Sequence, residues 1–456
     1  MNSWQKLLSW QRLGKEELPT QDPARSQFQM DYDRLVFSSA FRRLQDKTQV
    51  VPLPQTDYVR TRLTHSLEVS CIARTLGTLI GKTICAREKT LSAQIAPTDF
   101  GAICSAAALA HDLGNPPFGH SGEDAIRHWF RTSQIARALH GSLTPEQFAD
   151  IDRYEGNAQG FRIVTRLQMP DNPGGMQLTY AVLGAFTKYP RPSLLPPGFD
   201  AGPRRSMKKF GFFTTEWESF GQVAQGLGLK PLGSGGPAYQ RHPLAFVTEA
   251  ADDISYRIID FEDGFRLGLI DYDTIRRLFG ELAGSQELAK AEAKISGQRG
   301  VVEYLRARAI NRLVEQVVEV FAGHEESIVS GEYDRCLIED IPANPLLNEI
   351  QKKSVEQIYR SATNLEVELA GFEVIGGLLD RLVGAVEDVA HHGKAAAAPS
   401  RKLLQLIPEQ FVGPGRQPHT SAFGRLIRIL DYVSGMTDSY AVSLHKKLHG
   451  INLPVR

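Results

Sequence analysis

Apolar residues recur at helical spacing through most of this 456-residue chain, and no other feature constrains the fold as strongly. Between Leu305 and Phe321 they return every fourth residue, as on the buried face of a helix that we expect to end at Gly323. Strand-like alternation is scarce, and no strand–helix–strand rhythm appears. The sequence therefore predicts an all-α fold. Further helices are expected over residues 65–85, 101–113, 122–138, 247–262, 352–390 and 421–449.

Two stretches rich in Pro and Gly, residues 190–203 and 228–243, interrupt this pattern. The aromatic segment between them, KKFGFFTTEWESF, could form a small β-hairpin or a lid. Residues 391–401 have the composition of a surface linker. We therefore expect a helical core over residues 1–275, with an insertion at about 190–243, and a helical C-terminal region over residues 276–456 that packs on it.

The charges balance, with 52 Lys and Arg against 52 Asp and Glu, and 42% of the residues are hydrophobic. Such a chain can bury a large core in one or two domains. Zero net charge argues against a protein whose main partner is nucleic acid. Local basic clusters would still permit weak binding of single strands.

The sequence also predicts a cytoplasmic protein with no membrane partner. No segment approaches the roughly 18 apolar residues of a membrane span, and the first residues lack the apolar core of a signal peptide. The 4 cysteines, at positions 71, 85, 104 and 336, form no CxxC pair. This usage is typical of buried, reduced thiols.

One segment, Gly77-Thr-Leu-Ile-Gly-Lys-Thr83, resembles a phosphate-binding P-loop but does not meet its requirements. It is one residue short of the GxxxxGK[ST] spacing. It also continues a helix instead of following a strand. The backbone N–H groups that a P-loop presents to phosphate are therefore not available, and we expect no P-loop here.

The most informative segment is AAALAHDLGNPPFGHSGE, which begins at Ala106. An apolar helix runs into His111 and Asp112, and Gly114-Asn-Pro-Pro ends it there. Adjacent residues on a helix point about 100° apart, but at a helix end they can still share one cation. Further ligands must come from other parts of the chain.

Candidate partners are His65, at the start of another helix, and Asp252. Asp252, Tyr256 and Asp260 form one polar stripe at i, i+4 and i+8. Asp253 precedes Arg257 by four residues, so we interpret it as a solvated ion-pair partner. Two histidines with two carboxylates suit Mn, Fe, Ni, Zn or Mg and leave positions for water. From spacing alone, the alternative to a metal site is that these residues are hydrogen-bonded core groups or solvated side chains.

These segments resemble bacterial deoxyguanosinetriphosphate triphosphohydrolases of the HD-domain superfamily. HDLGNPPFGHSGE carries the resemblance most specifically. Five further blocks follow the order of that family between residues 33 and 441: DRLVFSSAFRRLQDKTQVVPL, VRTRLTHSLEV, YEGNAQGFR, EAADDISY and DYVSGMTDSYA. The resemblance thus covers nearly the whole chain.

The resemblance implies one divalent ion per subunit, with Mn²⁺ or Mg²⁺ preferred over Fe, Ni or Zn. It implies the ligands His65, His111, Asp112 and Asp252. It also implies that His120 and Glu123 flank the attacking water and the scissile phosphorus. From the residues alone, Ser121 is expected to cap the next helix and Glu123 to lie in its first turn, where the helix dipole favours a carboxylate.

The resemblance also implies a substrate-binding set. Gln49 and Asp260 resemble the pair that reads the sugar 3′-hydroxyl, and Tyr256 the ring that excludes a 2′-hydroxyl. The remaining members are phosphate or pocket contacts, because a triphosphate needs several cations around it. They are Arg62, Lys188, Tyr189 and Asn157, with Arg43 and Lys208 or Lys209 as further candidates.

The activity implied is water attack on the α-phosphorus of dGTP, or of other dNTPs, giving a deoxynucleoside and tripolyphosphate. The family forms homo-oligomers, often hexamers, and some members respond to allosteric nucleotides. Two alternatives stay open. One is another HD-type phosphohydrolase, such as a phosphodiesterase or a nucleotide phosphatase. The other is a non-catalytic nucleotide sensor or a nucleic-acid-binding protein.

Overall fold

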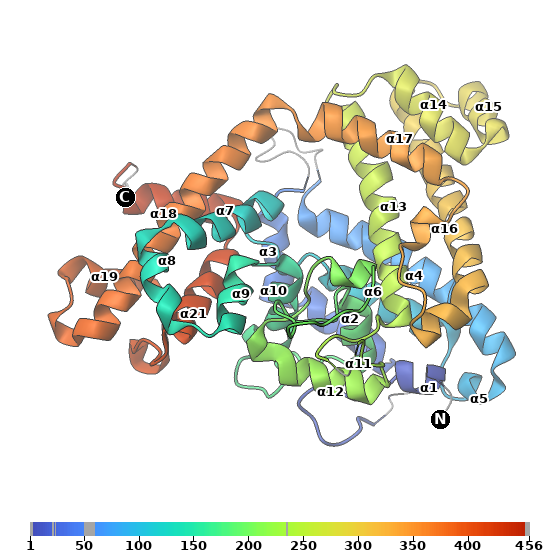
Figure 1. Ribbon diagram of the computed structural model, residues 1–456. Helices are drawn as coiled ribbons and strands as arrows, with labels where there is room; N and C mark the ends of the chain where they lie inside the picture. Colours follow the sequence, from blue (N-terminus) through green and yellow to red (C-terminus); the bar gives the residue numbers. More distant parts are fainter. Residues whose placement is uncertain (1–2, 21, 23, 50–59, 234–235, 452–456) are drawn as a thin grey trace.

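The computed structural model describes residues 3–20, 22, 24–49, 60–233 and 236–451. Over these residues the chain is helical, and its only β contacts are isolated bridges such as Thr48 with Thr61 (Figure 1). The predicted all-α fold is therefore confirmed. The shorter helices are α1 (Ser3–Leu7), α3 (Ser39–Arg43), α5 (Lys89–Ser92), α8 (Gln134–Leu139), α9 (Pro145–Asp152), α10 (Gly156–Arg162) and α20 (Glu409–Val412).

The centre of the fold is the packing of α4 (Arg62–Arg87) against α6 (Pro97–Ala110). Glycines let these helices approach closely: a Cβ at Gly77 would lie 2.6 Å from the Phe100 carbonyl oxygen. The P-loop-like segment is thus a helix interior, as expected. The helices α2 (Gln27–Val36), α11 (Tyr180–Phe186) and α13 (Pro243–Arg266) also pack on α6.

Among the described residues, α4 is the one helix long and apolar enough to cross a membrane, which the sequence analysis did not anticipate. More than half of its most apolar stretch is buried inside the protein, 56%. It packs against α6, α13 and α16 (Gln298–Ser330). A buried core helix passes the same test of length and composition, and α4 has the surroundings of such a helix.

Three predictions about secondary structure are wrong. The predicted hairpin segment forms short 3₁₀ turns and α12 (Trp217–Leu227), because its aromatic rings pack into the core: Phe212 stacks on Phe220 at 4.7 Å. Helix α16 continues past Gly323 to Ser330, since its buried face continues to Ile328. The predicted linker over residues 391–401 is largely helical, because α18 (Ala362–His392) is followed closely by α19 (Ala398–Leu406).

The buried apolar residues form two clusters. The first surrounds α4, α6 and α13 and includes α14 (Tyr272–Ala283), α16 and α17 (Asn344–Ser354), with α15 (Ser285–Lys294) packed beside them. The second joins α7 (Gly119–Thr132) to α18, α21 (Ala422–Ser434) and α22 (Asp438–Leu448). Early and late parts of the chain thus share each cluster (Figure 1). The division at residue 275 stays a prediction.

All four cysteines are free thiols. Cys85, Cys104 and Cys336 are buried, as expected, but Cys71 is exposed. The prediction of buried thiols is wrong for Cys71, because it lies at an exposed position of α4.

Asp150 fixes the Pro-rich segment to α9. Its carboxylate accepts hydrogen bonds from Ser193 Oγ at 2.6 Å and from the Thr214 backbone N–H at 2.9 Å. Burial raises the pKa of Asp150 to about 7 from an ordinary 3.8, even though these hydrogen bonds lower it. The folded protein therefore keeps a proton that the unfolded chain releases between about pH 4 and pH 7.

We predict that the Asp150→Asn variant loses less stability than the parent when pH rises from 4 to 7. Ionisation of Asp150 in the unfolded parent lowers the free energy of unfolding by up to about 4 kcal/mol, at about 1.4 kcal/mol per pKa unit. This loss of stability levels off above pH 7. Urea unfolding at several pH values measures the difference. Asp171→Asn, at an exposed position, is the control. Parallel pH dependence of the parent and the Asp150→Asn variant would contradict the prediction.

Candidate metal centre

Three helices bring three candidate ligands together. His65 lies in the first turns of α4, His111 is the residue at which α6 ends, and Asp252 lies inside α13. Nε2 of His65 lies 3.2 Å, and Nε2 of His111 3.5 Å, from Oδ1 of Asp252. One ligand atom of each residue lies within 4.8 Å of the others.

Asp112 completes the group. Its Oδ2 lies 3.5 Å from His111 Nε2 and accepts a hydrogen bond from Arg62 Nη1 at 2.8 Å. Its Oδ1 accepts a hydrogen bond from the Asn115 side chain. Burial would raise the pKa of Asp112, but the charge and the hydrogen bond of Arg62 hold this pKa well below its usual range. The carboxylate is therefore ionised, as a cation ligand must be.

His65, His111 and Asp252 fit a divalent ion, and Asp112 lies beside His111 where α6 ends. Nδ1 of His111 lies 2.6 Å from the Ala108 carbonyl oxygen, so it donates its proton there and leaves the Nε2 lone pair facing the two carboxylates. Lone pairs and carboxylate oxygens repel each other unless a cation lies between them. Their spacing of 3.2–3.5 Å is close to the roughly 3 Å edge of an octahedron around Mg²⁺. This nitrogen and oxygen set also suits Mn, Fe, Ni or Zn.

A second group, Glu249, Asp253 and Cys336, also brings potential ligand atoms together. Its charge is already balanced, because Glu249 pairs with Arg241 at 2.5 Å and with Lys188 at 3.1 Å. The interpretation of Asp253 as a solvated ion-pair partner is wrong. This residue is half-buried beside Glu249 and has no ion pair with Arg257 in the described chain. Burial raises the pKa of Asp253 to about 7.

His120 and Glu123 form a hydrogen-bonded pair at the edge of the group. Nδ1 of His120 lies 3.0 Å from Oε2 of Glu123, and Oε1 of Glu123 accepts the Gly156 N–H at 2.7 Å. Glu123 is buried, whereas the His120 side chain is 75% exposed. Burial would raise the pKa of Glu123, but the His120 contact and the charge of Lys209 keep it below its ordinary value. An ionised Glu123 thus orients a histidine that a substrate can reach.

The helix that carries this pair begins earlier than predicted. Phe118 is its N-cap, in the left-handed region at φ 63°, and α7 starts at Gly119. Ser121 is therefore not a cap, and Glu123 lies in the second turn. A non-glycine residue in the left-handed region depends on tertiary contacts, which the local sequence does not reveal.

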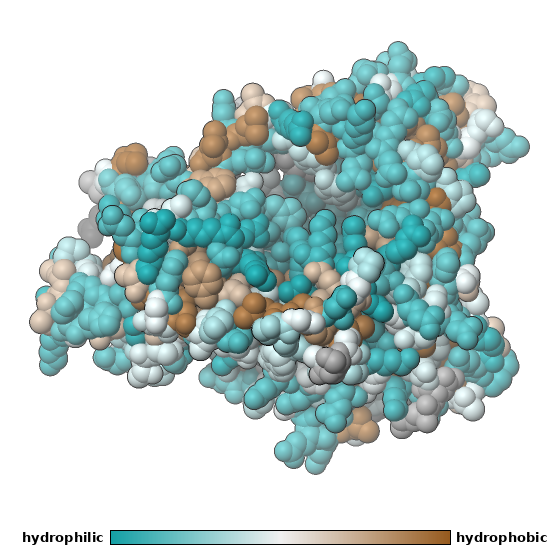
Figure 2. Space-filling view, in the orientation of Figure 1, coloured by the Kyte–Doolittle hydropathy of each residue, from teal (hydrophilic) through white to brown (hydrophobic). Residues whose placement is uncertain are grey.

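Two cavities meet at the candidate ligands and share His111, Asp112, His120 and Asp252. The first, of about 320 Å³, lies between α13 and α18, where Figure 2 shows a hollow in the surface. Its other lining residues are Thr48, Gln49, Arg62, His65, Phe118, Ser121, Tyr256, Tyr359, Asn364, Val367 and Glu368. The second, of about 270 Å³, is cationic. Its polar lining includes Asn115, Asn157, Lys188, Tyr189, Arg205, Lys208, Lys209 and Glu249.

The predicted substrate contacts divide between these cavities. Gln49, Arg62 and Tyr256 line the first, whereas Asn157, Lys188 and Tyr189 line the second. Two predicted residues line neither cavity. Asp260 is buried and accepts a hydrogen bond from the Tyr359 hydroxyl at 2.8 Å, and Arg43 lies 3.5 Å from Ser39 Oγ. Their roles stay predictions.

Sequence reasoning missed the contribution of the C-terminal region to the first cavity. Tyr359, at the end of the π-helical turn η7 (Val355–Tyr359), stacks on Tyr256 with ring centroids 5.7 Å apart and planes 6° from parallel. Val367 and Glu368 of α18 line the cavity beside it. It also missed Arg205 as a cavity cation. Tyr359 stood inside a predicted continuous helix, so no local signal distinguished it.

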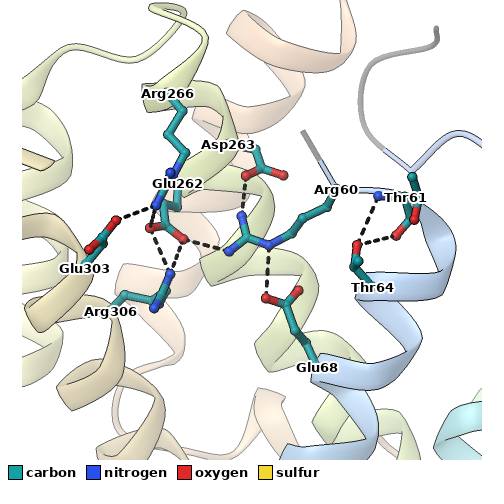
Figure 3. A network of polar contacts seen from close by, with 9 residues as sticks. All are labelled: Arg60, Thr61, Thr64, Glu68, Glu262, Asp263, Arg266, Glu303 and Arg306. Carbon is teal, nitrogen blue, oxygen red and sulfur yellow. Dashed lines mark hydrogen bonds and ion pairs between the residues drawn. The ribbon is translucent and has the colours of Figure 1, made fainter. Parts of the chain in front are cut away.

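A charged network fixes the start of α4 against α13 (Figure 3). The Arg60 guanidinium lies 3.0 Å from Glu68 of α4 and 3.1 Å from Glu262 of α13, and it also pairs with Asp263. Arg306 of α16 pairs with the same Glu262 at 2.8 Å. This network joins the two helices that carry His65 and Asp252, so it helps to set the distance between them.

Comparisons with known proteins identify the family of this chain. The HD domain family matches residues 62–155, and the phosphohydrolase-associated domain matches residues 344–447. The fold and the site thus define an HD-domain protein of the phosphohydrolase class. A deoxyguanosinetriphosphate triphosphohydrolase-like protein of Synechocystis sp. is 42% identical, over 99% of this chain and 100% of the relative.

Two further relatives extend the match. A deoxyguanosinetriphosphate triphosphohydrolase-like protein of Pseudomonas aeruginosa is 35% identical over 99% of both chains. The deoxyguanosinetriphosphate triphosphohydrolase of Klebsiella pneumoniae is 30% identical, over 93% of this chain and 94% of its own. The chain therefore belongs to the deoxyguanosinetriphosphate triphosphohydrolase-like family, and the resemblance found in the sequence is confirmed.

We predict that His111→Ala and Asp252→Asn each weaken Mn²⁺ binding by at least about tenfold, because each removes a donor atom or its charge. Titration of the protein with Mn²⁺, followed by electron paramagnetic resonance of the free ion, measures the affinity without turnover. His128→Ala, at an exposed histidine of α7, is the control. Equal affinity of all three variants and the parent would contradict a metal centre at this position.

Proposed function

We propose that this protein is a metal-dependent hydrolase of deoxynucleoside triphosphates, with dGTP as substrate. The observation that carries the proposal is the position of the candidate metal centre between the two cavities. We call the first, which Tyr256 and Tyr359 line, the aromatic cavity, and the second the cationic cavity. We expect a nucleoside to occupy the first and a triphosphate the second, which would put the α-phosphorus beside the candidate ligands. The names of the Synechocystis and Klebsiella relatives support the same substrate.

The cationic cavity would bind the triphosphate. Lys188 and Lys209 each pair with a buried glutamate, Lys188 with Glu249 at 3.1 Å and Lys209 with Glu155 at 2.8 Å. Burial lowers the pKa of both lysines, but Glu249 outweighs it at Lys188, and Glu123 together with Glu155 outweighs it at Lys209. Both pKa values are therefore raised, and both amines are charged. Arg205 and Lys208 add two further cations. Charge-assisted hydrogen bonds from such groups are the strong ones that a polyphosphate needs.

His65, His111, Asp112 and Asp252 would hold one divalent ion, Mn²⁺ or Mg²⁺, which supplies Lewis acidity and orients water when it is bound. The water oxygen bonds to the α-phosphorus, the bond from phosphorus to the 5′-oxygen breaks, and the leaving 5′-oxygen gains a proton. His120, oriented by Glu123, moves this proton. The rest of the rate acceleration comes from positioning of the substrate and from the fixed cations around its phosphates.

The aromatic cavity would bind the nucleoside. The stacked Tyr256 and Tyr359 form a rigid wall, and Gln49 lies at the same cavity. We assign Gln49 and Asp260 to the 3′-hydroxyl and Tyr256 to exclusion of a 2′-hydroxyl. Because the Asp260 carboxylate accepts a hydrogen bond from the Tyr359 hydroxyl, it contacts the sugar only if Tyr359 moves, or indirectly through that hydroxyl.

Several further properties belong to this proposal. We infer a cytoplasmic homo-oligomer, hexameric as the resemblance implies, that can respond to nucleotides at second sites and bind single strands weakly. The intact set of His120, Glu123 and four ligands favours an enzyme over a non-catalytic sensor. The same ligand set also serves other HD-type phosphohydrolases, so the products decide between them.

We predict that the purified protein with Mn²⁺ releases tripolyphosphate and deoxyguanosine from dGTP. Chromatography of reactions with each dNTP and NTP measures the products. Glu123→Gln is expected to lower kcat by about 10²-fold or more, because it loses the charge that orients His120, whereas Asp112→Ala abolishes turnover. Glu326→Gln, at an exposed position on α16, is the control. Release of a nucleoside monophosphate or orthophosphate, or full activity of Asp112→Ala, would contradict the proposal.

A further inference from the structure

The C-terminal block DYVSGMTDSYA, residues 431–441, carries two buried carboxylates that the proposed chemistry does not use. Asp431 accepts hydrogen bonds from Arg162 Nη2 at 2.8 Å and from the Gln159 side chain at 2.9 Å, so it holds α10. Asp438, the first residue of α22, is 2% exposed and lies closer to the site. Its contacts differ in kind, because they reach two walls of the aromatic cavity.

Asp438 accepts three hydrogen bonds from two distant segments. Its Oδ2 accepts the Thr48 backbone N–H at 2.9 Å and the Thr48 hydroxyl at 2.6 Å. Its Oδ1 accepts the backbone N–H of Phe118 at 3.0 Å. Thr48 and Phe118 both line the aromatic cavity. One buried carboxylate therefore fixes Thr48 relative to the segment that leads into His120.

The backbone that Asp438 holds is strained. Phe118 has φ 63° and Gly119 has φ 59°, so two consecutive residues adopt the left-handed region just before His120. A residue with a side chain keeps this conformation only where surrounding contacts enforce it. A Cβ at Gly119 would lie 2.5 Å from Arg62 Nη2, so Gly119 cannot be replaced without displacing Arg62. The Asp438 contact is one of the contacts that enforce this turn.

The same C-terminal block also supports the ligand Asp112. The buried Lys47 donates hydrogen bonds from Nζ to the Ser434 carbonyl at 2.9 Å and to the Asn115 carbonyl. Asn115 in turn donates from its side chain to Asp112 Oδ1. Residues 431–441 thus contact both the loop after the ligand pair and the turn before His120.

We propose that Asp438 is a positioning residue for catalysis. It holds the left-handed turn at Phe118 and so fixes His120 against the four ligands, an inference that rests on the proposed function. Asp438 touches neither cavity, so it binds no substrate. Its loss should displace His120 and lower kcat, because misplacement of a catalytic group by about 1 Å can cost about 10²-fold.

The test compares Asp438→Ala and Asp438→Asn with Ser439→Ala as the control. Ser439 is the next residue of α22, and its hydroxyl donates to Asp46 at 2.9 Å on the exposed side without touching the cavity walls. Asp438→Asn keeps the shape and one full acceptor, so it folds more surely. It can satisfy Thr48 or Phe118 but not both. Three quantities are measured: kcat for dGTP, Mn²⁺ affinity, and hydrogen–deuterium exchange of peptides covering residues 113–123.

For Asp438→Ala we expect kcat to fall at least about tenfold and exchange over residues 113–123 to accelerate, with a smaller effect for Asp438→Asn. Mn²⁺ affinity should stay within about twofold, since the hydrogen bonds that Asp438 accepts in the described chain come from Thr48 and Phe118 and from none of the four ligands. Unchanged exchange, unchanged kcat, or a parallel loss of Mn²⁺ affinity would each overturn the proposal. The exchange measurement needs no turnover, so a parent without dGTP hydrolysis would refute the proposed function, while the exchange rates would still decide whether Asp438 holds the turn at Phe118.

Discussion

The close packing of α4 against α6 determines where the candidate metal centre can form. Helix α4 begins near the point where α6 ends, so His65 at one terminus faces His111 at the other. Gly77 and Gly101 make this approach possible: a Cβ at Gly101 would lie 2.3 Å from the Thr78 hydroxyl oxygen. Helix α13 packs across both and adds Asp252. A change that separated these helices would disperse the ligands without altering any of them.

Charge balance shapes the surroundings of this centre. Asp112 lies beside Arg62, and the lysines of the cationic cavity are paired with buried glutamates. A substrate triphosphate would therefore exchange partners with carboxylates already present, which limits the cost of bringing a polyanion into a buried site. Arg60 and its carboxylate partners, none of which is a candidate ligand, hold α4 and α13 together (Figure 3).

The local sequence predicted some of this well. His111 and Asp112 were placed at a helix end because Gly114-Asn-Pro-Pro is a strong local stop signal, and the helix does end there. The convergence of His65 and Asp252 on them rested on the family resemblance, since no spacing rule joins residues 187 positions apart. The roles of Asp438 and Tyr359 were missed because they depend on partners from distant segments. The predicted hairpin failed because Phe210, Phe212, Phe213 and Phe220 are all buried in the core, which the alternation of a strand would not allow.

A crystal grown with Mn²⁺ and a non-hydrolysable dGTP analogue, measured at the manganese absorption edge, tests the central claim most directly. The account predicts one anomalous peak per subunit within coordination distance of His65, His111, Asp112, Asp252 and an α-phosphate oxygen. A peak beside Glu249, Asp253 and Cys336 instead, or no peak among the four ligands, would contradict it.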